Sequence, residues 1–483
     1  MPDQELTLDP SDWGAVRALG HQMLDDMIDH LCSLRERPAW REIPAEVKDS
    51  FRSPVPLEGS GLGQAYAGFR ERVLAYTGGN AHPRFWGWVK GSGSADGMLA
   101  ELLAAGLNIN AGMGFDNPPA YVELQVLDWC RSLFGFPADS GAAIVSGGSM
   151  ANFVALAVAR DAAAGSAAEQ GLRNLAAPLA FYCSDQTHNS VSKALRLLGL
   201  GREALRSVPT NAEYEIDLTA LDRMIAEDRA RGAKPACIIG NAGTVNTGAT
   251  DDLESLGAVA KREGMWFHVD GAFGAIAWLS PELRKIVRGI EQADSLAFDF
   301  HKWLHVQYEA GGVLVRSGEA HKKPFHEPAS YLKWMDRGYA NGPGNFHDYA
   351  PELSRQFKAL KIWIAFQSHG VDMYRRLAEQ NVAQANHLTR LVEQHESLEL
   401  LAPTALNVVN FRYRRPGLSE EQLNAANQEI LMRLQEEGTA VPSGTMLRGR
   451  FAIRCAITNH RSRLSDFDVL AEAVIRIGGE LGT

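Results

Sequence analysis

The stretch Asp294-Ser-Leu-Ala-Phe-Asp-Phe-His-Lys-Trp-Leu-His305 places Lys302 directly after an apolar run that predicts a buried strand. Most lysines are solvated surface charges, so a lysine at this position is unusual. Burial disfavours the charged form of an amine, lowers its pKa and makes it a nucleophile that can condense with a carbonyl cofactor. Lys302 is therefore a candidate catalytic residue.

A second strand lies just upstream, Met265-Trp-Phe-His-Val-Asp270, and the small residues Gly-Ala-Phe-Gly follow it. The carboxyl ends of parallel strands are where open α/β sheets bind ligands, and small residues let a flat ring approach the backbone. Alone, Asp270 would be a turn or helix-cap residue. Paired with Lys302 it fits pyridoxal 5'-phosphate (PLP), in which a lysine holds the aldehyde and an acid keeps the ring nitrogen protonated.

Short apolar runs alternate with helical patterns from residue 142 onward, which predicts an α/β fold with a mostly parallel sheet covered on both faces. The expected strands are Ala142–Val145, Pro178–Cys183, Ala236–Asn241, Met265–Val269, Ser295–Phe298 and Gly312–Val315. Ser146-Gly-Gly-Ser149 joins the first strand to a helix, and helix N-termini beside serine hydroxyls suit a phosphate. The pattern is neither G-x-G-x-x-G nor G-x-x-x-x-G-K, which disfavours dinucleotide and nucleoside-triphosphate sites.

Four motifs in order resemble the group II PLP-dependent decarboxylases, which include the aromatic-L-amino-acid, histidine and glutamate decarboxylases. They are Ser146-Gly-Gly-Ser-Met-Ala-Asn152, Ser184-Asp-Gln-Thr-His-Asn-Ser190, His268-Val-Asp-Gly-Ala-Phe-Gly274 and Asp299-Phe-His-Lys-Trp-Leu304. The resemblance runs from Asp12 to about Arg461. It implies PLP fold type I: an N-terminal helical dimerisation segment (1–80), a large PLP-binding domain (81–370) and a small C-terminal α+β domain (371–483).

The resemblance also assigns site residues. Cofactor contacts are implied for Gly148, Ser149, His188, Thr244, Asp270, Asp299, His301 and Lys302, and for Ser354 from a second subunit. His188 is expected to stack on the ring and meet the substrate carboxylate. Met150 replaces the usual acidic residue, and Asp299-Phe300 replaces the commoner Asn-Pro, so a phosphate contact of Asp299 is in doubt because an acid would repel the phosphate.

An aromatic segment, His82-Pro-Arg-Phe-Trp-Gly-Trp-Val-Lys-Gly-Ser92, corresponds to the family's substrate side-chain pocket. The resemblance therefore indicates Trp86, Trp88 and Val89 as substrate-binding residues. The two tryptophans favour an aromatic amino acid as substrate. Lys90, in the same wall, leaves an acidic or polar substrate open.

Tyr331 aligns with the loop tyrosine that, in the decarboxylases, returns a proton to the substrate. Phenylalanine there is associated with relatives that release an aldehyde. The expected reaction is decarboxylation of an L-amino acid to the amine. An aldehyde synthase, an aminotransferase and a non-enzymatic PLP-fold binding protein remain alternatives.

Composition narrows the partners. The 483 residues carry 48 basic and 58 acidic side chains, a net charge of −10, so nucleic acid and anionic membrane are not expected partners. Cys32, Cys130, Cys183, Cys237 and Cys455 are scattered, which favours free thiols in a cytoplasmic protein and no metal site. The N-terminus has no apolar signal region. The expected partners are an amino acid substrate and a second copy of the chain.

Overall fold

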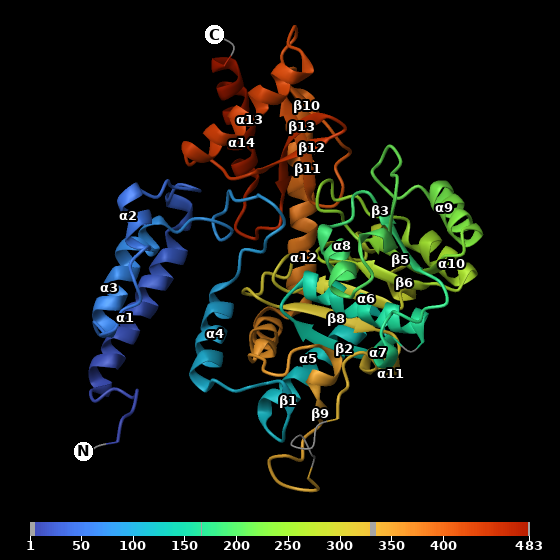
Figure 1. Cartoon of the computed structure of the whole chain (residues 1–483). Helices are drawn as coiled ribbons and strands as arrows, with labels where there is room; N and C mark the ends of the chain where they lie inside the picture. The colour runs from blue at the N-terminus through green and yellow to red at the C-terminus, as the bar shows by residue number, and fades with distance from the viewer. Residues whose placement is uncertain (1–4, 166, 329–334, 482–483) are drawn as a thin grey trace.

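A seven-stranded sheet forms the larger of two cores in the chain (Figure 1). The structure is a computed structural model that describes residues 5–165, 167–328 and 335–481. The strand order is β2-β8-β7-β6-β5-β3-β4. The strands are β2 Gly141–Val145, β3 Leu179–Ser184, β4 Leu205–Val208, β5 Lys234–Asn241, β6 Trp266–Asp270, β7 Ser295–Asp299 and β8 Gly311–Val315.

The sheet is mostly parallel, which confirms the predicted α/β class. Strands β4, β3, β5, β6 and β7 run parallel, whereas β8 runs antiparallel to both β7 and β2. The sequence did not indicate this reversal, because β8 is buried along its whole length and has the same apolar pattern as its parallel neighbours. Strand β4 was also not predicted, since three of its four residues, Leu205–Ser207, are not fully buried.

Helices cover both faces of this sheet. Successive strand residues point to opposite faces: Ile144 packs into one apolar cluster, and Ala143 and Val145 pack into another. The first cluster contains α5 Pro118–Phe134, α9 Leu218–Ala230 and α10 Leu253–Glu263, and the opposite face carries α6 Gly148–Ala164 and α8 Asn189–Leu197. The sheet is thus buried on both sides, and its carboxyl edge is left for the site.

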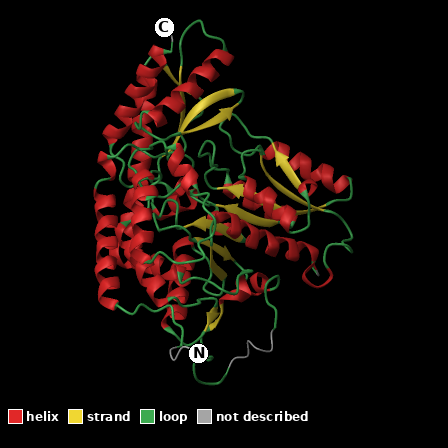
Figure 2. Cartoon of the chain, turned by 60° about the vertical axis from the view of Figure 1, so that its left-hand side comes forward, coloured by secondary structure: helices red, strands yellow, loops and turns green. Residues whose placement is uncertain are grey.

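A smaller antiparallel sheet forms a second core near the C-terminus, apart from the large sheet (Figure 2). Its order is β10-β11-β13-β12, and α13 and α14 pack on it. The elements are β10 Leu398–Leu400, β11 Val408–Tyr413, α13 Glu420–Glu436, β12 Ser443–Leu447, β13 Arg450–Ala456 and α14 Leu464–Glu480.

One long helix, α12 Lys358–Gln394, joins the two cores. Ile362 belongs to the large core and Leu388 to the small one. Gly370 interrupts the helix with a φ of 69°, a backbone conformation that favours glycine. The sequence-based domain boundary at 370 stays a prediction, although the helix changes direction at that residue.

The N-terminal helices stand beside the rest of the chain (Figure 1). They are α1 Trp13–Cys32, α2 Ala45–Ser50 and α3 Leu62–Arg72, and no residue of α1 is buried. The remaining elements are α4 Ala95–Leu107, β1 Met113–Gly114, α7 Ala167–Gln170, α11 Gly318–Lys322 and β9 Gly344–Asn345. Within the described ranges, every helix is too short or too polar to cross a membrane.

Candidate active site

The turn after β7 holds Lys302 in a buried frame. Phe300 and Trp303 on either side of it are buried, and the Trp303 indole N–H donates to Asn381 Oδ1 at 2.9 Å. Lys302 Nζ lies 2.9 Å from Asp299 Oδ2, and the lysine side chain keeps 22% of its surface exposed. The core therefore anchors the turn while the amine faces open space.

Asp299 is the buried partner of this amine. Its side chain is 1% exposed, and its Oδ1 has no hydrogen-bond partner among the described residues. A Cβ on Gly148 would lie 2.9 Å from Asp299 Oδ2, and one on Gly147 would lie 2.9 Å from His301 Cε1. A side chain at either position would therefore displace Asp299 or His301, because the loop after β2 approaches the Lys302 turn this closely.

That loop begins helix α6. Backbone N–H groups in the first turn of a helix lack intrahelical acceptors and favour anions. Ser146 and Ser149 place hydroxyls beside them, and Ser146, Gly148 and Ser149 all line the cavity that Lys302 enters. The loop therefore supplies hydrogen-bond donors for an anion on the wall of the cavity that Lys302 also lines.

His301 lies between the loop and the lysine. Its Nδ1 accepts the Ala310 N–H at 3.1 Å, so the neutral ring carries its proton on Nε2. Nε2 lies 3.8 Å from Asp299 Oδ2. Burial lowers the pKa of His301, so the ring is neutral near pH 7 and offers an N–H donor at the anion site.

Asp270 ends β6, the strand next to β7, and pairs in register with Ala297. Its Oδ2 accepts Asn152 Nδ2–H at 2.8 Å, and its Oδ1 accepts the Ala272 N–H at 3.2 Å. The carboxylate is 5% exposed. Asp270 and Lys302 therefore reach the same space from the ends of neighbouring strands.

His188 caps α8 and also faces this space. Its Nδ1 accepts the Ser190 N–H at 3.2 Å and lies 2.8 Å from the Ser190 hydroxyl. Burial lowers the pKa of His188, although the nearby Asp270 carboxylate opposes that shift. The structure thus presents a neutral imidazole on the cavity wall.

Two adjoining cavities of about 470 and 180 Å³ make up the site. They share a set of lining residues: Trp88, Val89, His188, Asp270, Ala272 and Lys302. The larger one also reaches Gly148, Asp299 and Lys90, and the smaller one reaches Thr244. Most residues expected at the site are therefore brought together.

Trp86 is not among them, which corrects the expectation that it binds substrate. It is 1% exposed, stacks on Phe467 with ring centroids 4.7 Å apart, and donates from Nε1 to Ser462 Oγ at 3.0 Å. The cause is the backbone pairing of this segment, in which Trp86 N–H donates to Val441 O at 2.9 Å. This pairing turns Trp86 into the apolar core of the C-terminal sheet.

Three other expected residues have different outcomes. Thr244 is 2% exposed, and its hydroxyl lies 2.9 Å from that of Thr247. Ser354 is exposed and lines neither cavity, and its expected role concerns a second subunit. Tyr331 lies outside the described residues.

Sequence reasoning did not single out Asn152 and Tyr308 as site residues. Asn152 follows Gly148 by four residues on α6, so helical spacing could have placed it on the same side. Tyr308 lines the larger cavity and its ring lies 4.3 Å from that of His301. It lies in irregular chain, where no periodic signal exists.

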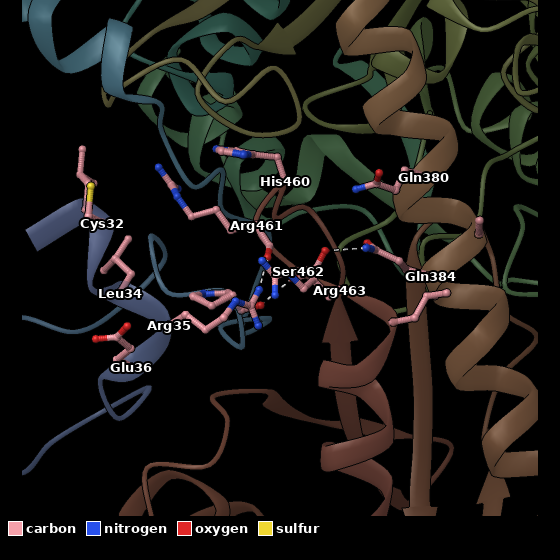
Figure 3. A pocket seen from close by; sticks show the side chains of 14 residues that line it. Cys32, Leu34, Arg35, Glu36, Gln380, Gln384, His460, Arg461, Ser462 and Arg463 are labelled. Atoms are coloured by element: carbon pink, nitrogen blue, oxygen red, sulfur yellow. Dashed lines mark hydrogen bonds between the residues drawn. The ribbon is translucent and has the colours of Figure 1, made fainter. Parts of the chain in front are cut away.

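A larger cavity, about 770 Å³, lies elsewhere, between the end of α1, helix α12 and residues 460–464 (Figure 3). Arg35, Arg461 and Arg463 line it. Neither Lys302 nor Asp270 does. The size of a cavity therefore does not identify the active site. The active site is identified by the Lys302 amine, the Asp270 carboxylate and the N-terminus of α6, which meet in one place.

The residues around Lys302 fit PLP. The Lys302 amine can condense with the aldehyde of PLP, and Asp270 can pair with the ring nitrogen. The N-terminus of α6 can bind the phosphate. The model of the pyridoxal-dependent decarboxylase conserved domain matches residues 63–414. The chain belongs to this family. It is a PLP-dependent amino acid decarboxylase of fold type I.

Relatives extend over nearly the whole decarboxylase. An aromatic-L-amino-acid decarboxylase of Bacillus atrophaeus is 34% identical over 92% of each chain. A phenylacetaldehyde synthase of Arabidopsis thaliana is 28% identical over 93% of each chain. A TDC of Oryza sativa, solved with PLP and tryptamine, superposes with a TM-score of 0.90 at 26% identity and covers 98% of this chain and 100% of that one.

Proposed function

We propose that this decarboxylase acts on an aromatic L-amino acid and releases the amine. Trp88 carries the proposal: it lines both cavities, is 53% exposed and has a φ of 56°. Its N–H donates to Ser443 Oγ at 3.2 Å. Lys90 Nζ lies 5.0 Å from the Trp88 ring centroid, so the cation packs on an aromatic face. An exposed indole on the wall favours a flat aromatic substrate.

We further propose a role for each of three side chains at the cofactor ring. Lys302 binds the aldehyde carbon, Asp270 pairs with the ring nitrogen, and His188 lies over the ring and donates from Nε2 to the substrate carboxylate. PLP, when bound, supplies an electron sink for the electron pair left when CO2 departs. The convergence of these three side chains on one cavity supports the assignment.

The phosphate is assigned to the loop after β2. Gly148 and Ser149 donate to it from the helix start, and the neutral His301 adds an Nε2–H. Ser354 of a partner subunit is proposed to complete the site, and Thr244 to contact the ring edge. Asp299 is proposed to orient the Lys302 side chain nitrogen, which their 2.9 Å contact supports.

Assays of CO2 release over the common L-amino acids test the substrate. We expect tryptophan, tyrosine or phenylalanine to exceed glutamate and aspartate. Trp88→Ala is expected to lower kcat/KM for the aromatic substrate roughly 10- to 100-fold, because the contact between the indole and the substrate ring is lost. The aromatic assignment would be overturned if only acidic amino acids were turned over and if Lys90→Ala abolished that turnover. Lys90 would then be the residue that recognises the substrate side chain.

The aldehyde-releasing alternative has its own test, because one curated relative is a phenylacetaldehyde synthase. Tyr331 favours the amine, since a phenol can return a proton to the substrate carbon. We expect the wild type to form amine without peroxide, and Tyr331→Phe to shift products toward aldehyde and peroxide. An unchanged amine yield in this variant would remove the role of Tyr331.

We also propose a homodimer. Helix α1 has no buried residue, and α4 exposes Leu99, Leu102, Leu103 and Leu107 at 40–58%. These positions recur at helical spacing, and contiguous exposed apolar surface marks an interface. A partner that covers this face would also bring Ser354 toward a neighbouring site.

Light scattering should therefore give twice the chain mass of 52.7 kDa. Leu102→Glu is expected to raise the dimer dissociation constant at least about tenfold, because a charge would be desolvated in the interface. Leu197→Glu, at a 71% exposed position on α8, is the matched control and should leave the dimer intact. A monomeric wild type with full activity would contradict the dimer.

Cellular location is proposed from the thiols. All five cysteines are free, and four of them are buried. Burial raises the pKa of Cys130 to about 12, so this thiol stays protonated. Free thiols without disulfides support a reducing cytoplasm.

A further inference from the structure

A line of hydrogen bonds runs beneath the active site from Trp266 to Asp270. Trp266 Nε1 lies 2.8 Å from Ser295 Oγ, which lies 2.9 Å from His268 Nδ1. His268 Nε2 lies 2.9 Å from Asn152 Oδ1, and Asn152 Nδ2 lies 2.8 Å from Asp270 Oδ2. His268 and Ser295 are 0% exposed and Asn152 is 1% exposed. Water therefore does not replace these partners.

The direction of each bond follows from the donors available. The Asn152 amide nitrogen faces a carboxylate, so its oxygen faces His268 and accepts from Nε2–H. His268 Nδ1 is then the acceptor, and the Ser295 hydroxyl donates to it. Trp266 N–H can only donate, and it donates to Ser295. Burial lowers the pKa of His268 to about 4, which agrees with a neutral ring carrying a single proton.

A branch reaches the other side of the cavity. The second Asn152 N–H donates to Ser190 Oγ at 3.0 Å. The Ser190 hydroxyl lies 2.8 Å from His188 Nδ1, which also accepts the Ser190 N–H. Since Nδ1 accepts both, the proton of neutral His188 resides on Nε2, on the side of the cavity. One amide thus touches the acid directly and the imidazole through a single hydroxyl.

We propose that Asn152, held in one orientation by His268, is a positioning residue that presents Asp270 as an acceptor and His188 as an Nε2–H donor. The inference rests on the roles proposed above for Asp270 and His188. An inverted amide would set its oxygen against the carboxylate and leave the Ser190 hydroxyl without its donor. His268 prevents this inversion because, within the described residues, it is the group that donates to Asn152 Oδ1.

Wild-type holoenzyme with ¹⁵N-labelled histidine gives the first test and requires no variant. The ¹⁵N chemical shifts should show protonated Nε2 and unprotonated Nδ1 at both His188 and His268 across neutral pH. The charged groups that face His188 are Asp270, Lys302, Asp299 and Lys193, so the same spectra are recorded against pH. Protonated Nδ1 at either ring would overturn the inference.

A matched pair of variants gives the second test. His268→Gln can still donate to Asn152 and accept from Ser295, whereas His268→Leu has a similar size and can do neither. Asn152→Leu is expected to lower kcat and PLP affinity roughly 10- to 100-fold, because the buried Asp270 carboxylate loses its Asn152 donor. His268→Leu should cause a similar loss, because the Asn152 amide is then no longer held in one orientation. His268→Gln should lose much less than His268→Leu. Equal losses in the pair would overturn the role of the amide direction.

Two outcomes separate this inference from the proposed function. A wild type that neither binds PLP nor releases CO2 would remove the proposed function itself. A working wild type whose Asn152→Leu variant keeps kcat, PLP affinity and the His188 Nε2–H signal would remove the inference alone. Melting temperatures of all variants check folding, and the wild-type histidine spectra decide the question if Asn152→Leu does not fold.

Discussion

Lys302→Ala should abolish CO2 release and the visible absorbance of bound PLP. The variant removes the amine whose Nζ lies 2.9 Å from Asp299 at the centre of the cavity. Water cannot replace it, because water has no nitrogen with which to condense with the aldehyde. The measurements are CO2 release under saturating PLP and the absorbance spectrum of the purified protein.

This substitution also leaves Asp299 without its cation in a site where the carboxylate is 1% exposed. We expect a loss of about 1–3 kcal/mol in the free energy of unfolding, as for other buried acceptors left unpaired. The double variant Lys302→Ala with Asp299→Asn should recover stability and stay colourless. Lys90→Ala removes a lysine of the same cavity wall and should keep the visible absorbance. Turnover and colour retained in Lys302→Ala would end the assignment.

Asp270→Asn should lower kcat by roughly a thousandfold or more. A carboxylate about 3 Å from a ring nitrogen stabilises its proton by roughly 5 kcal/mol at an effective dielectric of 20, or about four pKa units before desolvation is subtracted. Asparagine has nearly the same shape and lacks the charge, so the ring would be held but not kept protonated. The measurement is kcat for CO2 release at saturating PLP.

Asp251→Asn is the matched control for this effect. Asp251 is 2% exposed, and its Oδ2 accepts the Asn241 N–H at 2.8 Å, but it lines neither cavity of the site. We expect this change to lower the melting temperature and to spare most of kcat. A kcat in Asp270→Asn within tenfold of the wild type would show that Asp270 does not support the chemistry.

The sequence predicted the sheet and the lysine site for a clear physical reason. Buried parallel strands have sequences that are short apolar runs. Polar residues directly after such runs must lie at the same edge of the sheet, where the strands end. Lys302 and Asp270 each follow such a run, so their meeting could be predicted without coordinates. The roles expected of His188 and Gly148 came from the resemblance to the decarboxylases, and both residues lie where helices begin at that edge.

Other features depend on contacts that no local pattern encodes. Trp86 and Trp88 are two residues apart and look alike in sequence, yet the pairing of Trp86 with Val441, 355 residues away, decides which one reaches the cavity. The amide orientation of Asn152 depends on His268 from another element. Such long-range pairing determines which residues line the substrate pocket and which way the buried hydrogen bonds run. The positions of Lys302 and Asp270, by contrast, follow from the ends of their strands.

The attachment of the Trp88 segment to the C-terminal sheet has a further consequence. Trp88 N–H is held by Ser443 of β12, while Lys302 and Asp270 belong to the large sheet, and α12 bends at Gly370 between the two cores. A small rotation of one core relative to the other would move the Trp88 ring and so change the width of the substrate pocket. Lys302 and Asp270 would keep their positions relative to each other. Substitutions near Gly370, far from Lys302 and Asp270, would thus change which amino acids fit the pocket.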